Sequence, residues 1–388
     1  MGRPLIGFDG YMLLPNPKGV GRFQAQVIEA FARHGEWFRE LDMIIYHPRA
    51  WTPPHAGHLR FEAVDAVPET IWHLVRLPLA LRRDGCQGFM STADSFLSLP
   101  SCKNFVYLYE VPDYRARLLQ AGGAREWMVK HSLVPRFAMQ IDRVHRFACS
   151  SRATKRDLEL LYRVEPQRCS VIPSGVAPIF AEGVDVPPLP ELLDHSPYVL
   201  HFASTDPRDN TRVALEAFSE FVRWHGGGHK LVLAGNHSQS QEIKDWLTCY
   251  ELNARTVCLG HLQDSQLISV YRHAWAYLDP SLFEGFGLQL VEAQAAGAPV
   301  IASNNSSIPE VTAPGTLLCF HDDVHGFAEA LGALLNESVR QERIQAGRAH
   351  VAGFTWERTA KDWLAEVAEH VAQGPTPKGR RHSADPKN

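Results

Sequence analysis

Two glutamates enclose a short glycine-bearing loop in the second half of the chain. Glu284 and Glu292 are eight residues apart, and the first is followed by Gly285 and Gly287. Glycine lets a backbone approach a ligand closely, and a helix beginning near Leu288 would point its free N–H groups and positive dipole end at the loop. We therefore expect a phosphate group to bind at this loop, with the two glutamates at opposite ends of one elongated ligand.

The flanking sequence predicts the elements that would hold this loop. An apolar run ends at Asp279-Pro280. Farther along, Leu288, Val291 and Ala295 fall on one face of a helix. Gly297-Ala298-Pro299 then ends that helix and leads into a second apolar strand. The segment is therefore expected to form one β-loop-α-β unit.

These residues resemble the signature of the retaining GT-B glycosyltransferases, in particular family 4 (glycosyl transferases group 1). That signature is Glu-x7-Glu with Gly-Phe-Gly between the acids, and the chain matches it from Glu284 to Glu292. The resemblance implies that Glu284 contacts the donor sugar in a catalytic role and that Glu292 binds the nucleotide ribose. It also implies that the loop amides hold the donor β-phosphate. The loop residues concerned are Gly285, Phe286, Gly287 and Leu288.

Alternating strands and helices in both halves predict the α/β class, with ligands at the carboxyl ends of two parallel sheets. The resemblance implies a GT-B fold, in which two Rossmann-like, doubly wound domains face each other across a cleft. We expect an acceptor-binding domain at 1–180, a linker at 181–197 and a nucleotide-sugar-binding domain at 198–353. A helix at 354–372 would cross back to complete the first domain, and the polar tail 373–388 would be disordered.

Two loops of the first domain supply further candidates. Gly19-Val20-Gly21-Arg22-Phe23 resembles the Gly-Ile-Gly-Arg-Tyr loop of many family 4 members, which faces the cleft, so Gly19 and Gly21 are expected to contact the donor. Where the family commonly has His-Asp, this chain has Tyr109-Glu110. Tyr109 would donate a hydrogen bond to the donor sugar, and Glu110 would orient the acceptor or act as a base. A tyrosine packed at a strand end is the structural alternative.

The second domain departs from the family pattern at its first loop. Family members usually carry a lysine there that binds the donor diphosphate, whereas this chain has Asp209. A carboxylate repels a diphosphate unless a cation intervenes. Arg208 or Arg212 could supply the missing charge, and we favour Arg208 in a catalytic role. The remaining donor-binding candidates, by resemblance, are Ser204, Asn210, Gly260, His261 and Leu262.

Glycosyl transfer needs the leaving diphosphate to be stabilised as the anomeric C–O bond breaks, by a metal or by fixed donors and cations. The chain contains no Asp-x-Asp sequence. The resemblance also implies a metal-independent reaction with front-face retention, in which the leaving phosphate helps to accept the proton of the acceptor. We therefore expect no cofactor and no metal site, with the amides near Gly287 and the Arg208 side chain acting on the diphosphate.

The composition of the chain limits the classes of molecule that we expect it to bind. A formal net charge of −4 over 388 residues argues against general nucleic-acid binding. Seven scattered cysteines without a Cys-x-x-Cys pair suggest neither a disulfide framework nor a zinc site, and a reducing cytoplasm fits best. Between Ile71 and Arg168, 16 Lys and Arg residues stand against 9 Asp and Glu residues. This excess is either a solvated face or an attraction to an anionic acceptor or a membrane surface, and both interpretations stay open.

Three functions follow. The first is a hexosyltransferase that uses a UDP- or GDP-sugar and a glycan, lipid-linked or natural-product acceptor. Its glycine loop resembles that of polysaccharide mannosyltransferases, which points to GDP-mannose. The second is a catalytically weak nucleotide-sugar-binding relative acting in a complex, kept open by Asp209 and Tyr109-Glu110. The third is a hydrolase built on Glu284 and Glu292. Two helical turns separate positions by ~11 Å, whereas glycosidase carboxyl groups lie ~5 to 9.5 Å apart.

Overall fold

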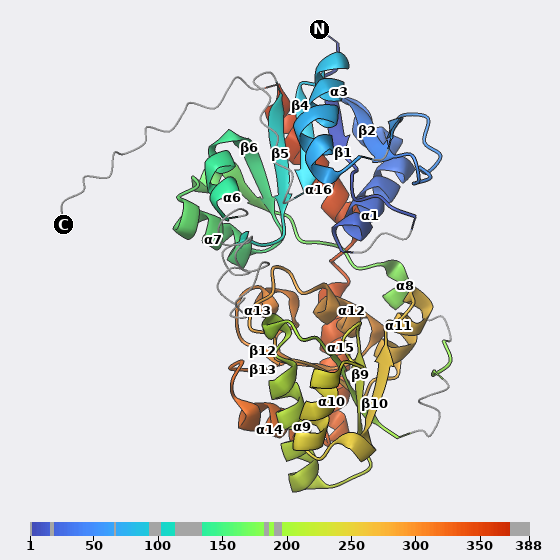
Figure 1. The fold of residues 1–388 in the computed structure, drawn as a ribbon, viewed down its shortest axis with the longest axis vertical. Coiled ribbons are helices and arrows are strands. Elements are labelled where there is room, and N and C mark those ends of the chain that lie inside the picture. The colour runs from blue at the N-terminus through green and yellow to red at the C-terminus, as the bar shows by residue number, and fades with distance from the viewer. Residues whose placement is uncertain are drawn as a thin grey trace, which may run out of the picture.

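The computed structural model describes residues 2–15, 19–65, 67–92, 102–112, 134–181, 186–189 and 196–372. These residues form two α/β domains, drawn one above the other in Figure 1. The tail predicted at 373–388 and most of the linker predicted at 181–197 lie outside the described residues. No helix in the described ranges is long and apolar enough to cross a membrane.

The first domain is built on a seven-stranded sheet with the order β3-β2-β1-β4-β5-β6-β7, in which every pairing is parallel. Its strands are β1 (Leu5–Asp9), β2 (Asp42–Pro48), β3 (Arg60–Val64), β4 (Gly88–Thr92), β5 (Lys103–Leu108), β6 (Val144–Cys149) and β7 (Cys169–Val171). Its described helical segments are α1 (Val20–Arg33), η1 (Gly35–Phe38), α2 (Glu69–Ile71), η2 (Trp72–Arg76), α3 (Leu77–Arg83), α6 (Val134–Gln140), η4 (Ile141–Arg143), α7 (Arg152–Tyr162) and η5 (Pro166–Arg168).

The second domain is built on a six-stranded parallel sheet with the order β10-β9-β8-β11-β12-β13. Its strands are β8 (Tyr198–Phe202), β9 (Lys230–Ala234), β10 (Thr256–Gly260), β11 (Ala276–Asp279), β12 (Val300–Ser303) and β13 (Leu317–Cys319). Its described helices are α8 (Pro178–Ala181), η7 (Pro207–Asp209), α9 (Thr211–His225), α10 (Gln241–Cys249), η8 (Asn253–Arg255), α11 (Asp264–Arg272), α12 (Leu288–Ala296), α13 (Ile308–Val311), α14 (Val324–Ala333) and α15 (Glu337–Val351). The predicted pair of doubly wound parallel sheets is therefore confirmed.

The last helix, α16 (Trp356–Val371), packs on the first domain although the second domain precedes it in the chain (Figure 1). Its Trp363 is buried against Phe8 and Tyr107, with ring centroids 5.8 and 5.4 Å apart. The chain thus passes between the domains twice, and the two passages are joined where the Val176 N–H donates to the Phe354 carbonyl at 2.9 Å. This double connection restricts how far the domains can separate.

A helical segment at 69–83 and the strand β3 were not predicted from the sequence. The segment includes a π-helical turn at η2, a feature that often marks functional sites. Its Trp72 and His73 are buried. Trp72 Nε1 donates to Asp9 Oδ1 at 3.0 Å, and His73 Nε2 forms a hydrogen bond with Asp9 Oδ2, also at 3.0 Å. The outward face of the segment carries exposed apolar side chains, namely Ile71, Leu74, Val75 and Leu79.

Candidate active site

The loop between β11 and α12 lies where the sequence places it. α12 begins at Leu288, directly after Gly287, whose φ of 89° is in the left-handed region that glycine tolerates. The helix is buried on almost every side, and the side chain of Glu292 within it is also buried. A rigid, buried helix therefore presents its N-terminal amides to the loop.

Serine hydroxyl groups bind the carbonyl groups of this loop. Ser307 Oγ donates to the carbonyls of Glu284 and Phe286 at 2.9 and 3.0 Å, and the Gly285 carbonyl accepts from Ser151 Oγ at 2.9 Å. In a trans peptide the N–H points opposite to the preceding C=O. The N–H groups of the next residues therefore point away from these serines. Among the described residues we find no acceptor for the N–H groups of Phe286, Gly287 and Leu288.

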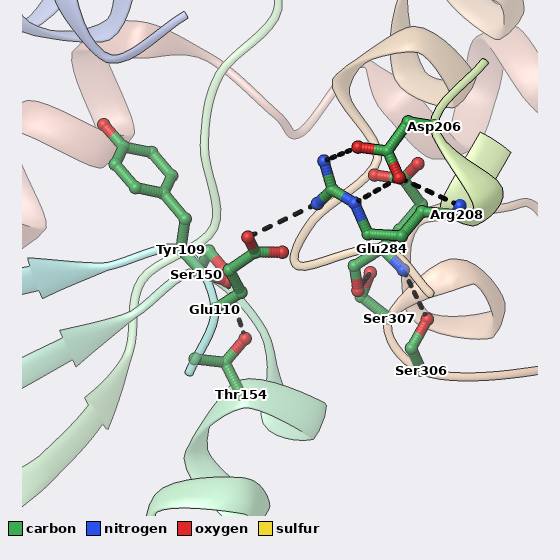
Figure 2. Close-up of polar contacts among 9 residues, drawn as sticks. All are labelled: Tyr109, Glu110, Ser150, Thr154, Asp206, Arg208, Glu284, Ser306 and Ser307. Carbon is green, nitrogen blue, oxygen red and sulfur yellow. Dashed lines mark hydrogen bonds and ion pairs between the residues drawn. The ribbon is translucent and has the colours of Figure 1, made fainter. Parts of the chain in front are cut away.

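The Glu284 side chain lies in an acidic environment beside Arg208 and Asp206 (Figure 2). Burial, followed by the nearby carboxylates of Asp279 and Asp209, raises the pKa of Glu284 well above its ordinary value, and the positive charge of Arg208 opposes that rise. The raised pKa favours the neutral carboxyl group, which can donate a hydrogen bond as well as accept one. Within the described ranges, no group of three or more His, Cys, Asp or Glu side chains could hold a metal ion.

Arg208 joins the two domains at this site. One guanidinium nitrogen lies 3.2 Å from Asp206 Oδ2, and another lies 3.4 Å from Glu110 Oε1, which belongs to the first domain (Figure 2). Arg212 points elsewhere, because its Nε donates to Tyr250 Oη at 2.9 Å on an exposed surface. Of the two arginines considered from the sequence, the structure brings only Arg208 to Glu110.

Asp209 is partly buried in the same loop. Burial raises its pKa to about 6, while a hydrogen bond with Ser204 acts against that rise and the charge of Asp206 adds to it. The neighbouring Asn210 adopts a left-handed φ of 51° and donates from Nδ2 to the carbonyls of Pro280 and His321 at 2.8 and 2.7 Å. The Asn210 side chain thus holds the loop in place rather than extending from it.

Three further donor-binding candidates, Gly260, His261 and Leu262, lie at the end of β10. Gly260 has a φ of 70°, and its N–H donates to Ser238 Oγ at 3.0 Å. Next to it, His261 is exposed and Leu262 is half-buried against the core of the domain. Gly260 therefore forms a turn, and the His261 side chain is exposed to solvent.

Glu292 is held by one residue from each domain. Its Oε2 accepts from Tyr271 Oη at 3.4 Å, and its Oε1 lies 3.5 Å from Arg22 Nη1. Arg22 belongs to the glycine loop of the first domain, in which Gly19 has a φ of 52° and Gly21 is buried at the start of α1. Arg22 was not among the site residues predicted from the sequence, although it lies in the predicted glycine loop.

Tyr109 occupies a packed position. Its side chain points away from Glu110 and Glu284 in Figure 2, and its ring lies 5.2 Å from those of Phe23 and Tyr107. The Tyr109 ring is therefore packed at a strand end, which is the structural alternative considered from the sequence. The backbone of Tyr109 does reach the site, because a Cβ added to Gly285 would come within 2.4 Å of the Tyr109 carbonyl oxygen.

The amino-acid sequence of this chain is similar to those of known glycosyltransferases. Residues 190–350 match the family model described as glycosyl transferases group 1. O-antigen chain mannosyltransferase B of Escherichia coli is 31% identical over 164 residues, which are 41% of this chain and 42% of that protein. D-inositol 3-phosphate glycosyltransferase of Acidothermus cellulolyticus is 28% identical over 246 residues, 59% of this chain and 54% of that protein. The chain thus spans about half the length of these two relatives.

Solved structures resemble nearly the whole chain. Sucrose-phosphate synthase from Thermosynechococcus elongatus has a TM-score of 0.72 at 17% identity, covering 95% of this chain and 98% of that one. The Anabaena protein HepE in complex with UDP and glucose has a TM-score of 0.67 at 14% identity, covering 95% and 100%. At these identities the likeness establishes the fold, which is the GT-B arrangement of two Rossmann-like domains.

Proposed function

We propose that this protein, whose second domain matches the glycosyl transferases group 1 family, transfers a hexose from a nucleotide diphosphate sugar to an acceptor hydroxyl. The observation that carries the proposal is the start of α12, where the amides of Phe286, Gly287 and Leu288 have no acceptor among the described residues. Amides at a buried helix N-terminus form a site for phosphate. The flanking Glu284 and Glu292 fit the two ends of a nucleotide sugar.

The proposed reaction breaks the bond between the anomeric carbon and the diphosphate oxygen and forms one from that carbon to the acceptor oxygen. The loop amides and Arg208 stabilise the negative charge that develops on the leaving diphosphate. The same diphosphate accepts the proton of the acceptor hydroxyl, so the sugar keeps its anomeric configuration. None of these steps assigns a role to a metal ion.

Each glutamate has a separate task in this proposal. Glu284, with its raised pKa, exchanges hydrogen bonds with hydroxyl groups of the donor sugar. Glu292 binds the ribose hydroxyls, since its carboxylate is fixed by Arg22 and Tyr271. Glu110 lies on the first domain beside Arg208 and is suited to orient the acceptor. For the donor we favour GDP-mannose or a UDP-hexose, because the related E. coli protein is named a mannosyltransferase and HepE was solved with UDP and glucose.

The surface of the helical segment 69–83 favours an acceptor that is held at a membrane. Four apolar side chains on its outward face are exposed, and exposed arginines accompany them: Arg76, Arg82 and Arg83. A helix with apolar and basic residues on its surface binds the interface of an anionic bilayer. We therefore propose that the first domain contacts an anionic membrane and that the acceptor is lipid-linked.

A second candidate function is nucleotide-sugar binding with little turnover, within a complex. The specific observation in its favour is that Arg208 already pairs with Asp206 and Glu110, while Asp209 adds another acidic group nearby. These carboxylates compete with a diphosphate for the guanidinium. The two candidate functions differ in whether the protein consumes the nucleotide sugar that it binds.

The test is acceptor-independent release of nucleoside diphosphate from UDP-glucose, UDP-galactose and GDP-mannose, with and without EDTA. A transferase hydrolyses its own donor slowly, so we expect release from one of them above the protein-free rate and unaffected by EDTA. The released sugar, examined by NMR at early times, should keep the donor's anomeric configuration. Donor binding without release would favour the second candidate, and neither binding nor release would refute both.

A further inference from the structure

The N-terminus of α7, in the first domain, is capped by a residue of the second domain. Glu310 Oε2 accepts the N–H of Arg152, and Glu310 Oε1 accepts the N–H of Ala153, each at 2.7 Å. Glu310 lies on α13, which is adjacent to α7 across the domain boundary in Figure 1. Such a cap is normally supplied from within the same helix or its preceding loop.

This cap is complete only when the domains touch. Ser151 Oγ accepts the N–H of Thr154 at 3.0 Å, which supplies one amide from the first domain itself. The first two amides of the helix depend on Glu310, whose negative charge also faces the positive end of the helix dipole. Separation of the domains would therefore expose two amides and one carboxylate to solvent at the same time.

A second contact joins the same end of α7 to the donor loop. The Gly285 carbonyl accepts a hydrogen bond from Ser151 Oγ at 2.9 Å. Ser150 Oγ and Thr154 Oγ1 lie 3.0 and 3.3 Å from the same carbonyl, and each also lies 2.8 Å from the Tyr109 carbonyl, so these two hydroxyls are shared between the two carbonyls. Figure 2 shows Ser150 and Thr154 close to Glu110, on the side of the site opposite to Arg208. The first domain thus fixes one peptide of the loop that would hold the donor diphosphate.

We propose that Glu310 is a positioning residue that locks α7 against the donor loop and thereby aims the loop amides at the diphosphate during transfer. The inference rests on the proposed function. Because the Gly285 carbonyl is bound by first-domain hydroxyls, the N–H of Phe286 in the same peptide points the opposite way, away from those hydroxyls. Loss of the lock would weaken the first-domain hydrogen bonds that orient this peptide.

The segment that carries Glu310 also explains why its loss should affect transfer more than donor binding. Ser307, three residues earlier, binds the carbonyls of Glu284 and Phe286 within the second domain. These contacts do not depend on Glu310, so most of the donor site remains intact without the lock. Transfer also requires Glu110 and the acceptor, which belong to the first domain.

The experiment compares Glu310→Ala and Glu310→Gln with Asn336→Ala. Asn336 caps α15 by accepting the N–H groups of Ser338 and Val339, so its variant loses two cap hydrogen bonds that lie within one domain. We would measure the radius of gyration by small-angle X-ray scattering, nucleotide affinity by calorimetry, and kcat. Glu310→Ala should enlarge the radius, keep the nucleotide Kd within threefold and lower kcat at least tenfold. Glu310→Gln should be intermediate, because it keeps one acceptor oxygen without the charge.

Asn336→Ala should match the wild type in all three measurements. An unchanged radius and kcat in Glu310→Ala would overturn the proposal, as would equal changes in Asn336→Ala. Loss of nucleotide binding in Glu310→Ala would also overturn it, because Glu310 would then act on the donor site itself. If the wild type transfers no sugar, the proposed function fails separately, and the scattering comparison alone decides whether Glu310 locks the domains.

Discussion

Arg22 Nη1 of the first domain lies 3.5 Å from Glu292 Oε1 of the second. The two residues come from the two motifs that the sequence singled out, the glycine loop and the second acid of the Glu-x7-Glu signature. Their pairing places both motifs on one site between the domains. It also holds the Glu292 carboxyl group in place beside a cation.

Replacement of Glu292 by alanine should weaken nucleotide binding. A hydrogen bond to a charged group contributes ~1.5 to 3 kcal/mol, which corresponds to roughly a 10- to 100-fold increase in Kd. Calorimetry with the preferred nucleoside diphosphate would measure the change. Glu342→Ala is the matched control, because the Glu342 side chain is 66% exposed and lies on α15. An unchanged Kd in Glu292→Ala would refute the ribose assignment.

Asp209 should make the folded state less stable as pH rises from about 4 to 6. Its folded pKa of about 6 is above its ordinary value of 3.8, so the native state binds more protons than the unfolded state in that interval. The stability that the neutral Asp209 carboxyl group contributes is fully present below pH 3.8 and is lost as the pH rises through about 6. Asp209→Asn should remove this dependence and raise the free energy of unfolding at pH 7 by about 1 to 2 kcal/mol, after allowance for solvent screening.

Urea unfolding at pH 4.5 and pH 7 would measure that difference. The wild type and Asp209→Asn should be closest in stability at the lower pH and separate at the higher one. A constant difference between the two proteins at both values would show that the Asp209 carboxyl does not titrate in this range.

The exposed apolar face of segment 69–83 should bind membranes. Leu74 and Leu79 are 65% and 60% exposed, so their replacement by serine removes apolar contact with little cost to the core. Co-sedimentation with vesicles containing phosphatidylglycerol should fall about tenfold or more in the double variant Leu74→Ser/Leu79→Ser. Leu160→Ser is the control, because Leu160 is 70% exposed on α7. Equal sedimentation of wild type and double variant would contradict the proposed membrane contact.

Trp363 should hold α16 on the first domain. It is 1% exposed, and removal of a buried tryptophan side chain costs about 3 to 5 kcal/mol. Trp363→Ala should therefore show an early unfolding transition in urea. Trp224, which is 44% exposed, provides the control, and Trp224→Ala should change stability by less than about 1 kcal/mol. Similar losses in both variants would mean that α16 adds no specific stability.

The fold could be predicted from the sequence because its central features are local. The run from Asp279 to Ser303 contains a strand end, a glycine loop, a helix and a second strand, and the structure keeps all four. The segment 69–83 could not be predicted, because its outward positions, such as Leu74 and Leu79, are apolar. Its inward side chains mix the apolar Trp72, Leu77 and Leu81 with the polar His73, so apolar residues lie on both faces and no clear periodicity marks the helix.

The sequence predicts individual candidate residues of the site but not the contacts that join them across the domains. Glycine at 285 was interpreted as room for a ligand, whereas the atom that a Cβ there would meet first is the Tyr109 carbonyl. A sequence shows that a backbone must approach something closely but not what it approaches. Glu310 was not predicted as a site residue, because its partner amides on α7 are more than 150 positions away in the chain.

The most direct test of the central claim is thermal stabilisation by UDP, GDP, ADP, dTDP and CMP, each with and without EDTA. A ligand at ~100 times its Kd adds about 2.7 kcal/mol to the stability of the fold. We predict selective stabilisation by one nucleoside diphosphate, undiminished by EDTA and much weaker with the matching monophosphate, because the loop amides bind the β-phosphate. No stabilisation by any of the diphosphates, or equal stabilisation by diphosphate and monophosphate, would contradict a diphosphate site at the start of α12.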